Sequence, residues 1–111
     1  MLLFLPPGEY HEIGLIFSKL LLSKYGHETI YLGANVPLDA LKQISMKKNI
    51  DNTLFFSISN FSTKNLQHNT LLIEKYFKTS KHYLVTSINN IKFENTKAIN
   101  NIDDFIKLIC K

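Results

Sequence analysis

An α/β fold, in which helices cover both faces of a parallel β-sheet, is the class that this sequence predicts. Apolar runs of strand length alternate along the 111 residues with segments whose apolar residues recur at helical spacing. About 45% of the residues are apolar, and eight Phe and five Tyr provide bulk for one core. We therefore expect one domain spanning residues 1–111.

The first half of the chain predicts two strands, each followed by a helix. The apolar run Leu2–Leu5 predicts a buried strand, and Glu12–Tyr25 predicts a helix that ends at Gly26 in a left-handed C-cap. Thr29–Leu32 predicts the second strand, and Leu38–Lys48 the second helix. The apolar positions of the second helix are Leu38, Leu41, Ile44 and Met46.

The second half predicts three more strands and two helices. Thr53–Ser59 is β-branched and aromatic enough to be a central strand. A helix follows from Ser62 or Thr63 to about Lys78, then a strand at Tyr83–Thr86. A short fifth strand, Lys97–Ile99, and a helix, 103–109, complete the chain. The third helix has an expected buried face of Leu66, Thr70, Ile73 and Phe77.

Right-handed crossovers favour a three-layer, flavodoxin-like or Rossmann-like arrangement with the strand order 2-1-3-4-5. In this order, the loops after the first and third strands flank a crevice at the carboxyl edge of the sheet. The crevice should therefore lie between residues 6–14 and residues 57–62, with residues 86–90 along the same rim.

Charge and cysteine content exclude several classes of protein. The 13 basic residues are all lysine, are scattered, and stand against nine acidic residues, which indicates a solvated surface rather than a nucleic-acid groove. The single cysteine, Cys110, permits no intrachain disulfide or cysteine metal site, and a reducing, cytoplasmic setting is expected. The apolar start, residues 1–5, is too short to be a signal peptide or to span a membrane.

The first loop carries a candidate metal ligand. An imidazole binds a metal through one ring nitrogen when the other nitrogen is held by an acceptor, and Glu9 can hold His11 in this way. Gly14 removes a side chain where a planar ligand would approach the backbone. The alternative interpretation is a surface acid–imidazole pair and a glycine that eases helix packing. Placement at the predicted crevice favours the ligand site.

These residues resemble the Asp-x-His-x-x-Gly motif of cobalamin-binding domains, with Glu9 in place of the aspartate. Residues 6–15 (PPGEYHEIGL) and 31–38 (YLGANVPL, which contains Val36) are similar to the C-terminal sensor domain of MerR-type, light-responsive, cobalamin-dependent repressors. The resemblance covers about residues 2–59. It implies adenosylcobalamin or methylcobalamin bound base-off, with His11 as the lower axial ligand of cobalt.

The resemblance also implies a slot for the displaced nucleotide tail. Ser57 and Ser59 match the small hydroxyl residues that end the third strand in that family, although ordinary strand-end capping would also account for them. The family's Gly-Gly pair at the end of the fourth strand is replaced by Thr86 and Ser87, which narrow the slot. The other histidines, His27, His68 and His82, are expected to be exposed or half-buried scaffold residues.

The residues that follow the predicted strands distinguish between functions that this fold can have. A response-regulator receiver needs acidic residues after the first strand and a phosphate-accepting Asp after the third, but Pro6-Pro7 and Ser57-Ile58-Ser59 stand there instead. A nucleotide-binding fold needs a glycine-rich turn, and the sequence has neither Gly-x-Gly-x-x-Gly nor Gly-Lys-Ser/Thr. No Ser/His/Asp or Cys/His set suggests an enzyme.

Three functions remain open. The first is a cobalamin sensor of a transcription regulator, which contacts DNA only through domains absent from this chain and forms a possible homo-oligomer. The second is a cofactor-free interaction or dimerisation module that keeps the fold. The third is a corrinoid carrier domain of a methyltransferase system.

Overall fold

The computed structural model describes residues 1–10, 12–57, 63–87, 93–100, 104, 105 and 107. Five parallel strands form one sheet in the order β2-β1-β3-β4-β5, as the sequence predicts. The strands are β1 (Leu2–Phe4), β2 (Ile30–Gly33), β3 (Asn52–Ser57), β4 (Lys81–Thr86) and β5 (Thr96–Ile99). The helices with described bounds are α1 (Ile13–Lys24), α2 (Leu38–Lys47) and α3 (Thr63–Tyr76).

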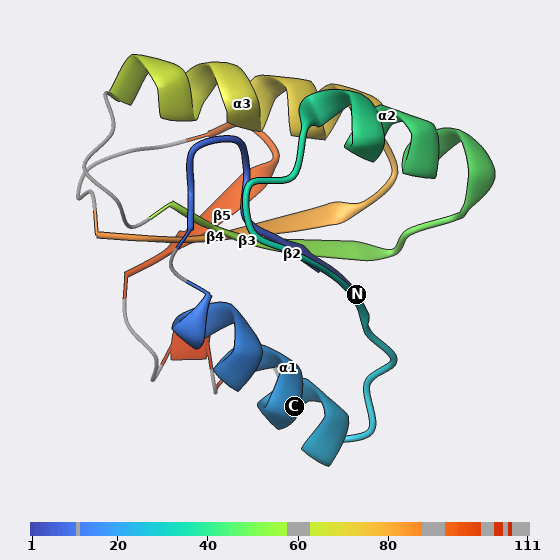
Figure 1. Ribbon diagram of the computed structural model, residues 1–111, viewed down its shortest axis with the longest axis vertical. Coiled ribbons are helices and arrows are strands. Elements are labelled where there is room, and N and C mark those ends of the chain that lie inside the picture. Colours follow the sequence, from blue (N-terminus) through green and yellow to red (C-terminus); the bar gives the residue numbers. More distant parts are fainter. Residues whose placement is uncertain (11, 58–62, 88–92, 101–103, 106, 108–111) are drawn as a thin grey trace.

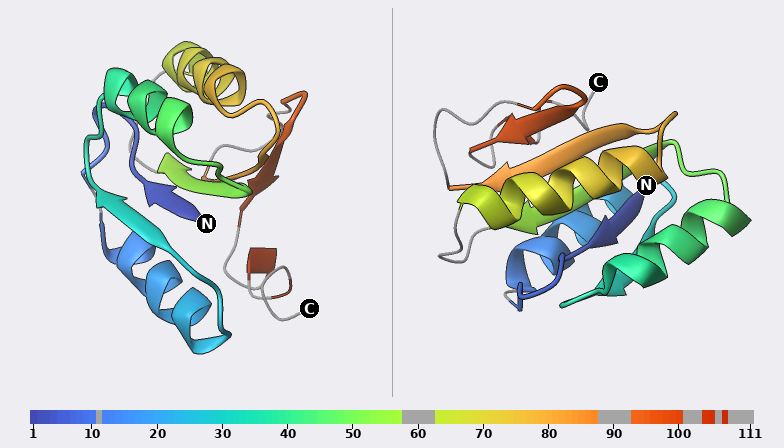
Figure 2. Two further views of the ribbon diagram at one scale, coloured as in Figure 1. Left: turned by 90° about the vertical axis from the view of Figure 1, so that its right-hand side faces the viewer. Right: turned by 90° about the horizontal axis from the view of Figure 1, so that it is seen from above.

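The helices lie on both faces of the sheet. In Figures 1 and 2, α2 and α3 lie side by side on one face, and α1 lies on the other. Crossovers of this kind place the carboxyl ends of all five strands at one edge. That edge carries the loop that leaves β1 and the residues that follow β3 and β4.

Two apolar cores lie on either side of the sheet, because successive strand residues point to opposite faces. Under α2 and α3, Phe4 stacks on Phe55 with ring centroids 5.4 Å apart. The α3 face predicted to be buried is confirmed, since Leu66, Thr70, Ile73 and Phe77 are all buried. On the α1 side, a second core is formed by Leu3, Leu5, Leu15, Leu22, Leu54, Phe56, Ile99 and Phe105.

Helix ends follow local sequence rules with small differences from the expected bounds. Gly26 has the predicted left-handed conformation, with φ of +83°, and the His27 amide donates back to the Leu22 carbonyl. Met46, one of the apolar positions of α2, is 78% exposed, because it lies slightly more than half a turn from Ile44 and so faces away from it. Of the predicted last helix, Asp104, Phe105 and Lys107 are helical, and its other residues lie outside the described part.

Candidate functional site

A crevice of roughly 310 Å³ opens at the carboxyl edge of the sheet. Its walls come from the loop after β1, the last residue of β3 and the first half of α3. The lining residues are Pro6, Pro7, Gly8, Glu9, Ser57, Asn65, Leu66 and Asn69. A crevice is therefore present where the loop after the first strand meets the end of the third, as predicted, while residues 58–62 of the expected second wall lie outside the described part.

The loop after β1 is fixed by hydrogen bonds to the loop between β2 and α2. The Asn35 amide donates to the Glu9 carbonyl at 2.9 Å, and the Gly8 amide donates to Asn35 Oδ1 at 2.8 Å. The Val36 amide donates to the Leu5 carbonyl at 2.9 Å. Asn35 adopts a positive φ of 51°, which asparagine tolerates better than most residues. The two segments that carry the family resemblance are thus joined in space.

Glu9 occupies the inner wall of this crevice. Its side chain is only 2% exposed, and the Ser57 hydroxyl donates to Glu9 Oε1 at 3.3 Å. A buried carboxylate requires hydrogen-bond donors, so this contact contributes to the position of the carboxylate. His11, the proposed metal ligand, lies outside the described residues. The flanking Tyr10 and Ile13 are both exposed.

Gly14 meets the sheet rather than open space. A Cβ atom at this position would lie 2.7 Å from Cε2 of Phe56, closer than real Cβ atoms approach another heavy atom. The absence of a side chain therefore lets the first turn of α1 lie against β3. The packing role that the sequence left as an alternative for Gly14 is thus observed.

The remaining candidate residues occupy different positions. Val36 is buried in the core under α2 and α3, whereas Ser59 lies outside the described residues. Thr86 is buried and pairs in register with Ser57, so the two residues end neighbouring strands. Ser87 is exposed. Neither Thr86 nor Ser87 lines the crevice, and residues 88–90 of the expected rim lie outside the described part.

Two asparagines that line the crevice were not identified from the sequence. Asn65 and Asn69 lie four residues apart on α3, which places both side chains on one side of the helix. Each carries an amide that can donate and accept hydrogen bonds. Their i, i+4 spacing was the available signal, but asparagine is frequent in this chain and the spacing did not stand out.

The entry to α1 is held by a contact with the edge strand β2. The Tyr31 hydroxyl donates to Glu12 Oε2 at 3.1 Å, and the Lys19 ammonium lies over the Tyr31 ring, 5.3 Å from its centroid. Burial raises the pKa of Tyr31, and the Glu12 carboxylate raises it further. Because Glu12 directly follows residue 11, this contact restrains the second end of the loop.

His82 corrects one expectation, since it is 2% exposed rather than a surface or half-buried residue. Its Nε2 lies 3.0 Å from the Phe77 carbonyl, which can only accept, so Nε2 carries the proton. Nδ1 then accepts from the Thr53 hydroxyl at 2.6 Å. Burial lowers the pKa of His82, while the Phe77 carbonyl and Glu74 favour its charged form. The imidazole is therefore a buried, hydrogen-bonded part of the fold.

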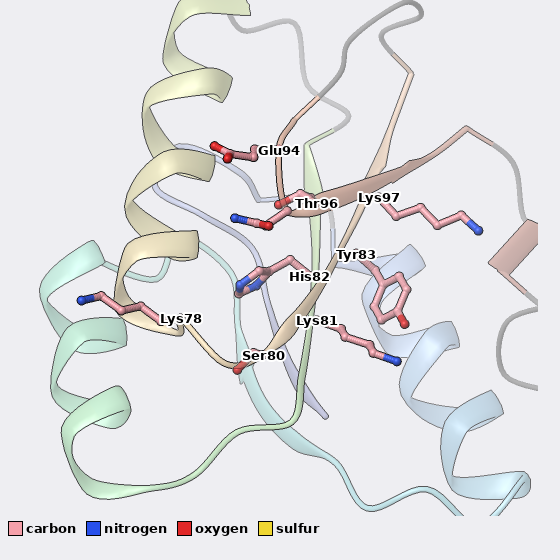
Figure 3. Close-up of a pocket in the computed structure, with 9 residues that line it drawn as sticks. Lys78, Ser80, Lys81, His82, Tyr83, Glu94, Thr96 and Lys97 are labelled. Atoms are coloured by element: carbon pink, nitrogen blue, oxygen red, sulfur yellow. The ribbon is translucent and has the colours of Figure 1, made fainter.

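A second pocket, of roughly 480 Å³, lies beside His82 at the opposite, amino edge of the sheet. Figure 3 shows the Lys78 and Lys97 side chains pointing away from each other, and Glu94 also lines the pocket. Lys81 extends to the same side as Lys97, so Lys78 does not join the other two lysines at a common point, as an anion site of all three would require. The crevice at the carboxyl edge remains the better candidate site.

Metal binding by a side-chain cluster and a membrane-spanning helix are two further features to consider in the described part of the chain. Among them, no group of three or more His, Cys, Asp or Glu side chains could hold a metal ion. No helix within the same described part is long and apolar enough to cross a membrane.

Comparison with known proteins shows the fold. No protein-family model matches the chain, and no curated protein matches it by sequence. Among solved structures, it is similar to a novel cobalamin-binding protein from Desulfitobacterium hafniense DCB-2, with a TM-score of 0.72 at 15% identity. It is also similar to the monomethylamine corrinoid protein of Methanosarcina barkeri, with a TM-score of 0.65 at 20% identity. Each alignment covers 96% of this chain but only 55% and 54% of the respective neighbours, about half their length.

Proposed function

We propose that this chain is a cobalamin-binding domain in which His11 is the lower axial ligand of cobalt and the cofactor is bound base-off. The observation that carries the proposal is the position of Glu9. Its carboxylate is buried in the wall of the carboxyl-edge crevice, two residues before His11 and beside Ser57. The similarity in fold to two corrinoid-binding proteins supports the same ligand class.

The residues present fit this cofactor. The Glu9 carboxylate is an acceptor for the N–H of an imidazole, and such a contact fixes the tautomer of a metal-binding histidine and raises its basicity. The crevice combines the apolar Pro6, Pro7 and Leu66 with the amides of Asn65 and Asn69. A slot of this composition suits a nucleotide tail with a flat apolar base and polar linking groups. Bound cobalamin supplies a cobalt centre that carries an adenosyl or methyl group.

The limit on tail binding that we propose comes from Thr86, which does not line the crevice but ends the strand beside Ser57, which does. It lies next to Ser57 across the β3–β4 ladder and is fully packed, at a position where the resembled family has glycine. Its branched side chain fills space that a glycine would leave open. We therefore expect weaker tail binding than in proteins with the Gly-Gly pair. Ser87 is exposed and contributes less to this limit.

The biological role that we propose is sensing in a transcription regulator in the cytoplasm, without catalysis by this domain. The two matching segments, which the hydrogen bonds of Asn35 join, support this assignment. DNA would be contacted through other domains of such a regulator. A corrinoid carrier is the second candidate, favoured by the similarity to the monomethylamine corrinoid protein. A cofactor-free module is the third, favoured by the packed Thr86 side chain.

Cobalamin retention tests the ligand. The purified chain is mixed in the dark with hydroxocobalamin, adenosylcobalamin or methylcobalamin and desalted, and the corrin absorption that stays with the protein is recorded. His11→Ala should remove the spectrum of histidine ligation, and Glu9→Gln should weaken binding by roughly 10- to 100-fold. His68→Ala, on the exposed face of α3, is the matched control and should change neither.

The outcomes separate the three functions. Absence of retained colour in the wild-type chain, with colour gained by Thr86→Gly combined with Ser87→Gly, would support the cofactor-free module. An unchanged spectrum in His11→Ala would exclude the proposed cobalt ligand. If the adenosylcobalamin complex binds but its oligomeric state is the same before and after illumination, the carrier replaces the light-responsive sensor.

A further inference from the structure

The helix α1 is apolar on two opposite faces. Its inner face packs Leu15, Ser18 and Leu22 against the sheet, where all three are buried. Its outer face carries Ile13, Ile16, Phe17 and Leu20, which are 86%, 44%, 46% and 63% exposed. A surface helix of a monomer normally shows polar residues on its outer side. We call these four residues the outer stripe.

The outer stripe is large enough to bind a partner. Large apolar side chains offer about 150–250 Å² each, so these exposed fractions correspond to on the order of 500 Å² of contiguous apolar surface. Two such surfaces would bury about 1,000 Å², which is the size of weak, reversible interfaces and below that of standard stable ones. Lys19, which follows Ser18 on the helix, is directed to the Tyr31 ring, and Lys24 lies one turn beyond Leu20 at the end of the stripe.

The spacing of the outer stripe is symmetric about its own centre, the midpoint between Ile16 and Phe17. A second copy related by a two-fold axis through this point would pair Ile13 of each copy with Leu20 of the other. It would likewise pair Ile16 of each copy with Phe17 of the other. The residues lie in two i, i+4 rows, the rows that interdigitate in the commonest class of helix packing. An isologous interface needs this self-complementarity, whereas a different partner does not.

Charge at the helix ends favours the same arrangement. Antiparallel helices place the carboxyl end of each helix next to the amino end of the other, so that the two helix dipoles are complementary. We propose that the outer stripe is a homodimer interface at which α1 packs antiparallel against α1 of a second copy.

The oligomeric state of the cofactor-free full chain tests this interface, independently of cobalamin. Sedimentation velocity from low micromolar to several hundred micromolar protein should show a reversible monomer–dimer equilibrium. Leu20→Glu should raise the dissociation constant at least 100-fold, because it places a charge against Ile13 of the other copy at two symmetric points of the apolar contact. Leu71→Glu is the matched control, since Leu71 is 60% exposed on α3, on the other face of the sheet. Circular dichroism verifies that both variants are folded.

A cross-linking experiment tests the geometry of the interface. In a Cys110→Ser background, Phe17→Cys lies next to the proposed axis and should form a disulfide-linked dimer on mild oxidation, whereas Leu71→Cys should not. A wild-type chain that stays monomeric throughout the concentration range overturns the proposal. So does a dimer that Leu20→Glu leaves unchanged.

Discussion

Replacement of Gly14 by alanine tests how closely α1 approaches the sheet. Alanine in a helix interior is favoured over glycine by about 1 kcal/mol, which is an upper bound for Gly14 in the first turn of α1. Against this, the new Cβ would lie 2.7 Å from Cε2 of Phe56, a buried ring in the α1-side core. Overpacking of a well-packed core costs about 1–3 kcal/mol. We expect the clash to exceed the propensity gain, with a net loss of about 1 kcal/mol in the free energy of unfolding.

Urea unfolding followed by circular dichroism measures this balance. In a Phe56→Leu background the ring edge is gone, so Gly14→Ala should become stabilising by up to about 1 kcal/mol, its propensity gain. The coupling between the two substitutions should therefore reach about 2 kcal/mol. If Gly14→Ala stabilises the wild-type chain as much as the Phe56→Leu variant, the close approach is refuted. Cobalamin retention by the variant that combines Gly14→Ala with Phe56→Leu then tests whether the absence of a side chain at position 14 is also needed for cofactor binding.

Acid pH and the loop clamp give two further predictions. Burial lowers the pKa of His82 in the folded chain. As the pH falls below about 6.5, the unfolded chain therefore binds a proton at this imidazole before the folded chain does. The free energy of unfolding should then drop by at most about 1.4 kcal/mol per pH unit. Urea unfolding at several pH values should show this slope. The double variant Thr53→Val with His82→Leu, which replaces the hydrogen-bonded pair, should remove it. An unchanged slope in this variant would mean that other groups cause it. Asn35→Ala loses the hydrogen bond to the Gly8 amide and retains a positive φ, so it should cost about 2 kcal/mol. Asn35→Gly loses the hydrogen bond but tolerates this φ, and equal destabilisation by both substitutions would contradict the strain argument.

Local patterns predicted most of the fold because they depend on neighbours in the chain. The apolar run at Leu2–Phe4 and the helical spacing of Leu66, Thr70 and Ile73 express periods of two and 3.6 residues. Gly26 ended α1 because only a residue that accepts positive φ fits there. Element ends differed by one or two residues, as terminal turns depend weakly on sequence. His82 was misjudged because its strand begins two residues earlier than its apolar pattern indicates.

The candidate site was predicted only in outline. The sequence placed Glu9 and Ser57 on two loops that meet at a crevice, since strand order follows from the handedness of crossovers. It did not identify Asn65 and Asn69 as lining residues. Whether they line the crevice depends on how α3 is rotated on the sheet, and an isolated helix pattern does not specify that rotation to one residue.

By itself, the sequence determined the order of elements, the sheet topology and the edge at which the first loop lies, because these follow from local periodicity and chain handedness. Only the tertiary structure decided which distant atoms meet. Ser57 reaches Glu9 across 48 residues, and Phe56 occupies the space beside Gly14. Such contacts depend on strand register and helix depth, where a shift of one residue reverses the face that a side chain occupies.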